Sequence, residues 1–229
     1  MSFINNNGIK ISYSIIDECD GDYLLLHTGL NSTKEAWIEL SYTEELKKHF
    51  KIVLIDPRGH GESDKPRDLK KYSFKLMADD VVALLDNLEI KRVHFFGYSL
   101  GGLVGWQMIN YYPERLLSLV AGGSRVKFPP DRPNAFLRLS FLQEGPIENA
   151  DTPTQPYDIE HLLPNIKLPV LTFVGDKDTS CYPFVDEYSK LIPNCTTFVL
   201  PDLNHPQTMM DKEQVLPRVL AFLKEYSTK

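Results

Sequence analysis

The sequence predicts an α/β fold, with a mostly parallel central sheet, helices on both faces and an antiparallel hairpin at the N-terminus. Short runs of apolar residues, typical of buried strands, alternate with longer segments whose apolar residues recur at helical spacing. The composition agrees, because 42% of the 229 residues are hydrophobic and 24% are charged. These are the proportions of an ordinary globular protein, and they exclude a disordered or fibrous chain.

Charge and cysteine content narrow the classes of function. Lys and Arg total 25 against 31 Asp and Glu, and the net charge of −6 offers no basic surface to nucleic acid or an anionic membrane. The three cysteines form no C-x-x-C pair, and neither a signal-peptide core nor a run approaching ~18 apolar residues is present. We expect a cytoplasmic monomer or homodimer that binds neither nucleic acid nor membrane and has no metal site.

The individual elements follow from local patterns. Residues 3–15 should form a β-hairpin, because the Asn-Asn-Asn-Gly sequence at 5–8 tolerates the positive φ of a tight turn. The apolar run 23–27 predicts a buried strand, and helical spacing follows over 37–50. The later apolar runs that predict strands are 52–55, 92–96, 116–121, 170–174 and 196–200. The later segments predicted to be helices are 74–88, 100–111, 184–191 and 212–226.

One proline-rich segment breaks this alternation. Between residues 124 and 168 no strand is predicted, although residues 134–143 could form a short helix. The aromatic and leucine content of the segment favours an ordered lid over a disordered linker. We therefore predict one domain, with a core formed by residues 1–122 and 168–229 and a lid segment at residues 123–167.

The chemistry is expected at the carboxyl ends of the strands, where right-handed crossovers place every strand-to-helix turn. Residues 97–101 read Gly-Tyr-Ser-Leu-Gly and lie between a predicted strand and a predicted helix, which is the setting of a nucleophile elbow. In such a turn the serine oxygen projects above the sheet edge. We predict Ser99 as a nucleophile, and the alternative is a tight turn with an idle serine.

A serine hydroxyl needs a base, and the base needs an acid that orients it. In a fold of this kind the chain order is Ser, Asp or Glu, then His. His205 follows the last strand, on a loop before the final helix, and is the predicted base. Asp176 and Asp178 both follow strand 170–174. We favour Asp178 as the acid because it lies further round the turn, and we expect Asp176 to support the turn.

The transition state also needs donors for the developing oxyanion. The backbone N–H of Leu100 is one candidate, because it lies at a helix N-terminus where N–H groups are unpaired. The second is expected in the turn after strand 23–27. There we predict the N–H of Leu30, with that of Gly29 as the alternative.

Together these residues resemble the α/β-hydrolase fold superfamily, in its esterase-like branch, over nearly the whole chain outside the proline-rich segment. The segments that carry the resemblance are 27–30 (His-Thr-Gly-Leu), 56–64 (Asp-Pro-Arg-Gly-His-Gly-Glu-Ser-Asp), 97–101, and 175–178 with His205. The resemblance implies hydrolysis of esters or related acyl compounds without a cofactor. It also implies that residues 56–64 form a structural turn, so neither Arg58 nor His60 is predicted to be catalytic.

Two features depart from the family pattern. Relatives usually read His-Gly at the oxyanion turn, whereas Thr28 intervenes here. Residues 123–167 resemble the insertion that usually forms a helical cap but are reduced, which suggests an open, shallow acyl site. The apolar side chains that are expected either to line this site or only to pack the lid are Phe128, Phe136, Leu137, Phe141 and Leu142.

The predicted function is a serine hydrolase that cleaves a small carboxylic ester through an acyl-enzyme. Thioesters, lactones, peptides with N-terminal proline, C–C-bonded diketones and perhydrolysis share the same triad and stay open. Similar dehalogenases and epoxide hydrolases use an aspartate where this chain has Ser99. The alternative is a ligand-sensing or signalling protein that resembles hydrolases and turns over slowly or not at all.

Overall fold

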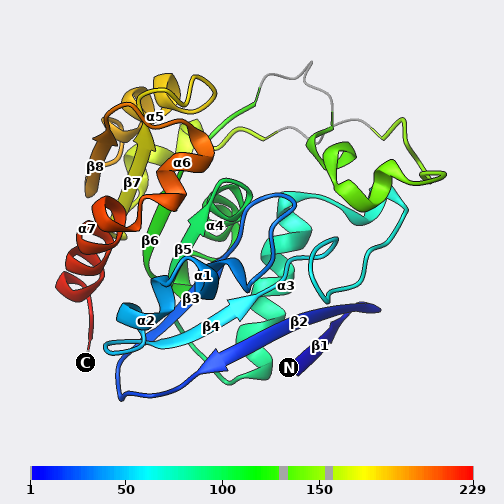
Figure 1. Cartoon of the computed structure of the whole chain (residues 1–229), viewed down its shortest axis with the longest axis horizontal. Helices are drawn as coiled ribbons and strands as arrows, with labels where there is room; N and C mark the ends of the chain where they lie inside the picture. Colours follow the sequence, from blue (N-terminus) through cyan, green and yellow to red (C-terminus); the bar gives the residue numbers. More distant parts are fainter. Residues whose placement is uncertain (1, 129–133, 153–156, 229) are drawn as a thin grey trace.

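A computed structural model describes residues 2–128, 134–152 and 157–228 (Figure 1). Eight strands form one sheet in the order β1-β2-β4-β3-β5-β6-β7-β8. The strands are β1 (Ser2–Asn6), β2 (Ile9–Ile16), β3 (Tyr23–His27), β4 (Lys51–Ile55), β5 (Val93–Tyr98), β6 (Leu116–Gly122), β7 (Val170–Gly175) and β8 (Cys195–Leu200). The pairs β1–β2 and β2–β4 are antiparallel and all later pairs are parallel, so the predicted α/β class is confirmed.

The N-terminal hairpin forms where the asparagine–glycine sequence predicts it. Asn7 and Gly8 have φ values of 51° and 83°, the left-handed region that a two-residue hairpin turn requires. Asn5 Oδ1 accepts a hydrogen bond from the Gly8 N–H at 2.9 Å, which closes the turn.

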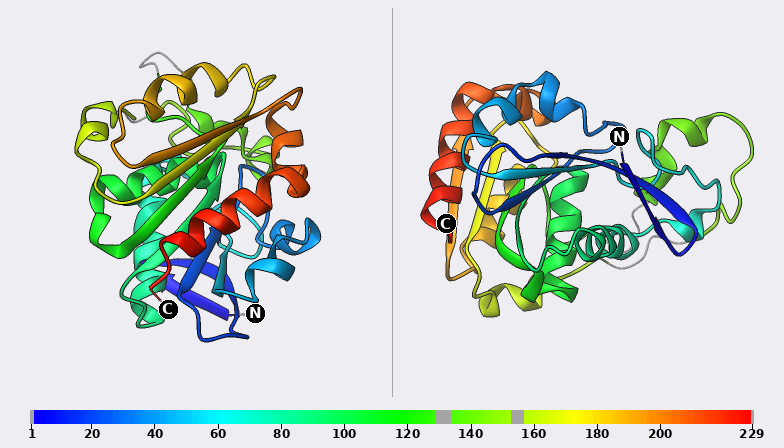
Figure 2. Two further views of the ribbon diagram at one scale, coloured as in Figure 1. Left: turned by 90° about the vertical axis from the view of Figure 1, so that its left-hand side faces the viewer. Right: turned by 90° about the horizontal axis from the view of Figure 1, so that it is seen from below.

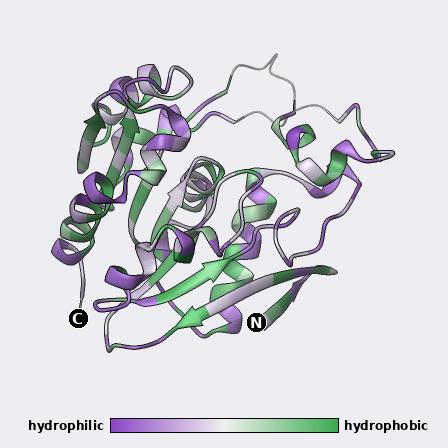
Figure 3. Cartoon of the chain, in the orientation of Figure 1, coloured by the Kyte–Doolittle hydropathy of each residue, from purple (hydrophilic) through white to green (hydrophobic). Residues whose placement is uncertain are grey.

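Helices cover both faces of the sheet (Figures 2 and 3), because the strands β3, β4, β5, β6 and β7 bury apolar side chains on both faces. Leu25 and Phe95 belong to a core that includes residues of α3 (Phe74–Asn87), α4 (Leu100–Tyr111) and α5 (Tyr182–Ser189). Leu24 and Phe96, one residue away along the same strands, belong to the opposite core. That second core includes residues of α1 (Ala36–Glu39), α2 (Tyr42–Leu46) and α7 (Lys212–Glu225).

Two predicted helices differ in the structure. The helix expected over 37–50 is divided into α1 and α2, because Ser41 between them has a φ of 58° and cannot continue an α-helix. The segment 134–143 forms two short 3₁₀ turns, η3 (Ala135–Arg138) and η4 (Ser140–Gln143). The remaining short elements are η1 (Leu69–Lys71), η2 (Pro113–Arg115), η5 (Glu160–Asn165) and α6 (His205–Met210).

The described part of the predicted lid segment packs beside α3. Phe136 contacts Tyr72 and Phe74, with ring centroids 5.7 and 5.0 Å apart. Phe74 also contacts Tyr157, at 5.1 Å. The lid prediction also includes residues 129–133 and 153–156, which lie outside the described residues. Within the described ranges, no helix is both long and apolar enough to cross a lipid bilayer.

Candidate active site

The turn from β5 into α4 holds Ser99 in a conformation that only a tightly constrained backbone maintains. Ser99 has φ 55° and ψ −111°, and its N–H donates to the carbonyl of Gly122 at 2.9 Å. A Cβ on Gly97 would overlap the backbone of Gly101, and a Cβ on Gly101 would overlap the carbonyl of His27. The glycines of the motif therefore allow the close backbone approach that presents the Ser99 hydroxyl at the sheet edge.

His205 begins the short helix α6, where the sequence predicts only a loop. The Asn204 side chain accepts from the Gln207 N–H and the Gln207 side chain accepts from the Asn204 N–H, a reciprocal capping box. Pro206 follows in the first turn, a position at which its missing N–H costs nothing. The Tyr98 hydroxyl donates to the His205 carbonyl, so β5 also fixes this residue.

The structure brings Ser99, His205 and Asp178 into one chain of hydrogen bonds. His205 Nε2 lies 2.9 Å from Ser99 Oγ, and His205 Nδ1 lies 2.5 Å from Asp178 Oδ2. A serine nucleophile, a general base and an orienting acid require hydrogen bonds between these atoms at such distances.

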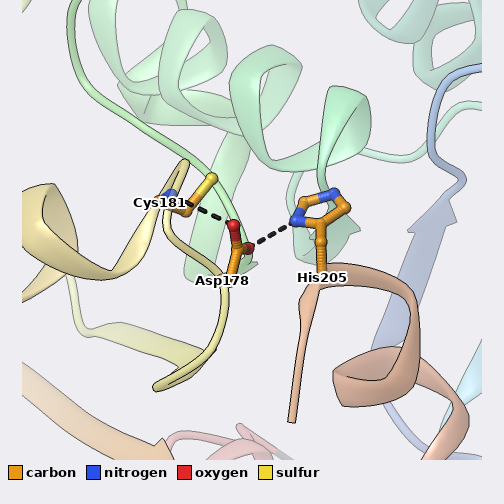
Figure 4. A group of neighbouring side chains, drawn as sticks. All are labelled: Asp178, Cys181 and His205. Atoms are coloured by element: carbon orange, nitrogen blue, oxygen red, sulfur yellow. Dashed lines mark hydrogen bonds and ion pairs between the residues drawn. The ribbon is translucent and has the colours of Figure 1, made fainter.

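Asp178 is buried, and its two oxygens have separate partners. Oδ2 faces His205, while Oδ1 accepts from the Ser180 hydroxyl at 2.7 Å and from the Cys181 N–H at 3.1 Å (Figure 4). Asp176 lies outside this network, and its Oδ1 accepts from the Asp202 N–H at 2.8 Å. The structure thus places Asp178 against the imidazole and Asp176 in support of the turn. Sequence reasoning missed the contributions of Ser180 and Cys181.

The protonation of the pair follows from its surroundings. Burial disfavours the imidazolium, but hydrogen bonding with Asp178 and Cys181 and the charge of the Asp178 carboxylate outweigh it and raise the pKa of His205 to about 9. Burial alone would raise the pKa of Asp178, but hydrogen bonds from His205 and Ser180 leave this pKa below its ordinary value. Asp178 is therefore a carboxylate at neutral pH, and it stabilises a positive charge on His205.

The two turns that carry the predicted oxyanion donors lie beside Ser99. Leu100 is the first residue of α4, so its N–H has no acceptor within the helix. Leu30 and Ser99 line the same hollows, and a Cβ built on Gly29 would lie 3.5 Å from Ser99 Cβ. Thr28, the residue that departs from the family pattern, is buried, and its carbonyl lies 3.1 Å from His27 Nδ1.

One set of described side chains could hold a metal ion. Asp178, Cys181 and His205 each offer a ligand atom, and these atoms lie within 4.8 Å of one another. The hydrogen bond between Asp178 and His205 already uses two of these groups, and the Cys181 thiol donates to the Gly123 carbonyl at 3.3 Å.

Two hollows meet at Ser99 and His205. One, of about 440 Å³, extends towards Arg125 and Arg138, and the other, of about 380 Å³, extends towards Trp37. Among the five apolar side chains expected at the site, Phe128 lines the larger hollow. The four that line neither hollow are Phe136, Leu137, Phe141 and Leu142. Phe136 and Leu142 are buried in the packing of the lid segment instead.

The turn at residues 56–64 is tied into the core. The Arg58 guanidinium donates to both carboxylate oxygens of Asp80, at 2.7 and 2.8 Å, and both side chains are buried. The Asp56 carboxylate accepts from the Lys34 ammonium at 2.6 Å and from the Glu62 N–H at 3.2 Å. These contacts stabilise a turn, and none of these groups touches Ser99.

Comparison with known proteins is consistent with this architecture. Residues 22–153 match the sequence model of the family described as alpha/beta hydrolase fold. The chain is 24% identical to 3-oxoadipate enol-lactonase 1 of Acinetobacter baylyi, over 96% of this chain and 95% of that protein. It is 28% identical to human epoxide hydrolase 4 over 58% of this chain, and the match covers 34% of that protein. The chain spans less than half the length of several curated relatives that it matches. A solved structure of a hydrolase from Pseudomonas aeruginosa has a TM-score of 0.80 and 22% identity, with 97% of each chain covered.

Proposed function

The chain belongs to the α/β-hydrolase fold family, and from that premise we propose that it is a serine hydrolase of a small carboxylic ester or related acyl compound. The observation that carries this proposal is the continuous path from Ser99 Oγ to His205 Nε2 and from His205 Nδ1 to Asp178. A small-molecule acyl substrate, rather than a nucleic acid or a membrane, suits hollows of about 380 and 440 Å³ beside this path.

The proposed reaction proceeds through an acyl-enzyme. Ser99 Oγ attacks the substrate carbonyl while His205 Nε2 accepts its proton, and the N–H groups of Leu100 and Leu30 stabilise the oxyanion. His205 then donates the proton to the leaving alcohol. Water, deprotonated by His205, releases the acid and restores Ser99. Asp178 keeps the proton of the neutral imidazole on Nδ1 and stabilises the imidazolium.

Ser99 also separates the proposal from epoxide hydrolysis. The relative from human named epoxide hydrolase 4 shares part of this chain's sequence. Similar epoxide hydrolases use an aspartate at the elbow, whose carboxylate attacks the epoxide. A serine alkoxide attacks a carbonyl carbon more readily than an epoxide. The resulting ester of Ser99 is then hydrolysed by water that His205 activates.

A serine-reactive phosphonate tests the proposal. Intact mass and peptide mapping should place one label on Ser99, and His205→Ala should slow labelling strongly. Ser99→Ala should lower kcat for a neutral ester such as p-nitrophenyl butyrate by at least ~10³-fold. Rapid turnover that survives in Ser99→Ala would sink the proposal. A single turnover that leaves a long-lived adduct would favour a sensing protein instead.

A further inference from the structure

We propose that Arg125 and Arg138 bind a carboxylate of the substrate, so that the preferred acyl compound is anionic on one side of the scissile bond and apolar on the other. This inference rests on the proposed function and names the substrate class of the same site. It follows from a difference between the two hollows that meet at Ser99 and His205.

The Arg125 guanidinium contacts two aromatic rings and can still bind an anion. It follows β6 by three residues, and its guanidinium lies over the rings of Phe184 and Phe128, at 4.2 and 5.8 Å from their centroids. Among the described residues, no carboxylate or carbonyl accepts a hydrogen bond from its guanidinium. These cation–π contacts restrain the guanidinium without using its N–H groups, which can therefore donate to a carboxylate.

Arg138 comes to the same hollow from the predicted lid segment. Asn31 fixes the backbone here, because its Nδ2 donates to the Arg138 carbonyl at 3.0 Å and its Oδ1 accepts from the Ser140 N–H at 2.8 Å. The Arg138 guanidinium is exposed and has no acidic partner among the described residues. Asn31 lines the hollow as well.

The larger hollow is lined by positive charge, although the whole chain has a negative net charge. The protein carries a net charge of −6, yet the described residues that line the larger hollow include two arginines and no Asp or Glu. Arginine side chains without acidic partners at the edge of a site cost little when exposed, but they attract an anion and orient it.

The smaller hollow has the opposite character. Its lining includes Trp37, Leu40, Met209 and Met210, and it contains the exposed carboxylate of Glu39. Apolar side chains disfavour a desolvated carboxylate, and Glu39 repels one. A substrate with one anionic end is therefore expected to place that end on Arg125 and its apolar end beside the methionines.

Paired substrates test the inference. One pair is the p-nitrophenyl monoester of glutaric acid and its neutral methyl-capped analogue, and the other is 4-acetoxybenzoate and its neutral methyl ester. The first pair carries the charge on the acyl group, and the second carries it on the leaving group. For at least one pair, the ratio of kcat/KM for the anionic over the neutral ester should exceed one. Arg125→Gln should lower this ratio by ~10-fold or more, and Arg138→Gln should lower it by a smaller factor.

Arg92→Gln is the matched control, because Arg92 is exposed and precedes β5, at the strand end opposite Ser99. It removes the same charge and should leave the ratio unchanged. Calorimetric titration of Ser99→Ala with the glutarate monoester gives a readout without turnover. Binding should weaken when Arg125→Gln is added.

The results distinguish a failure of the carboxylate-binding inference from a failure of the proposed hydrolase function. Neutral esters that are hydrolysed through Ser99, with no anionic preference in either pair, would overturn the inference alone. A preference that survives in both arginine variants would also overturn it. Ester hydrolysis that persists in Ser99→Ala would overturn the proposed function, whatever the selectivity.

Discussion

At the level of single residues, we expect the Asp178–His205 pair to set the pH range in which His205 can accept the proton of Ser99. The imidazole must be neutral to accept a proton on Nε2, and the Asp178 carboxylate stabilises its cation. Because the pKa of His205 is raised, a smaller fraction of its imidazole is neutral at low pH. The same interaction stabilises the positive charge that forms in the transition state.

This balance predicts the pH profile. Below the pKa of His205, kcat/KM for a neutral ester should rise about tenfold per pH unit, and the limb should extend above pH 6.5. In Asp178→Asn the charge that raises the pKa is gone and burial remains, so the acidic limb should move to lower pH. The profiles of both proteins between pH 5 and 10 check this, and a limb that does not move would contradict it.

Two neighbouring aspartates distinguish a catalytic carboxylate from a structural one. Asp178→Asn should lower kcat by on the order of 10³–10⁴-fold, because the amide cannot hold the required tautomer or stabilise the cation. Asp176→Asn should have a small effect, because its amide oxygen can still accept from the Asp202 N–H. Steady-state kinetics of the two variants decide the assignment. A crippled Asp176→Asn beside a nearly normal Asp178→Asn would reverse it.

At the level of elements, the sequence predicts the helices and strands whose apolar residues form a regular local pattern. The helices α3 and α7 are recognised because each buries apolar residues at the helical period, and the central strands because each is a continuous apolar run. The break at Ser41 is missed, because apolar spacing continues past a residue with positive φ. The helix α6 is missed although Asn204-x-x-Gln207 is a readable capping box, since a six-residue helix has almost no periodicity.

In the candidate site, too, the residues that belong to local sequence motifs are predictable, whereas those brought together by long-range packing are not. Ser99, Asp178 and His205 follow from a local motif and from the rule that parallel strands end at one sheet edge. The neighbours of Phe136 depend on packing against Tyr72 and Phe74, about sixty residues away in sequence, and no local pattern encodes such a contact. Arg125 and Arg138 are likewise ordinary charged residues until the fold places them at one hollow.

The capping box of α6 gives a prediction for an element. Asn204→Ala should cost about 1 kcal/mol of stability, because it leaves the Gln207 N–H without its side-chain acceptor. His205 is the next residue, so kcat should fall as well. Asn204→Ser is the matched control, because serine also caps helices and should retain most of both properties. Denaturant unfolding and kcat measure the two effects, and equal behaviour of the two variants would contradict this role of the cap.

At the level of the whole molecule, the proposed catalytic residues and the predicted lid segment belong to different parts of the structure. Ser99, Asp178 and His205 follow the parallel strands β5, β7 and β8 of one sheet, whose hydrogen bonds fix their relative positions. The described lid residues have short 3₁₀ turns and contact the core through side chains and through the backbone of Glu148, which exchanges hydrogen bonds with the backbone of Arg67 and Leu69. Arg67 makes the densest of these contacts, because its guanidinium donates to four carbonyls, those of Phe141, Leu142, Gly145 and Pro146.

Arg67 is therefore expected to control local opening of the lid segment without controlling global unfolding. In Arg67→Ala the four carbonyls lose their donor. Gly145 and Pro146 are exposed, so water can replace their hydrogen bonds at little global cost, and the one carbonyl that belongs to a buried residue, that of Leu142, has the longest bond to Arg67, at 3.4 Å. Limited proteolysis with a broad-specificity protease should cut residues 143–151 faster, whereas the denaturation midpoint should move little. Arg67→Lys offers a point charge in place of a planar fork and should rescue only part of the protection. Because Arg138 lies in the loosened segment, selectivity for the anionic ester should fall with the same variant. Faster cleavage accompanied by an equal loss of global stability would show instead that the segment unfolds together with the sheet.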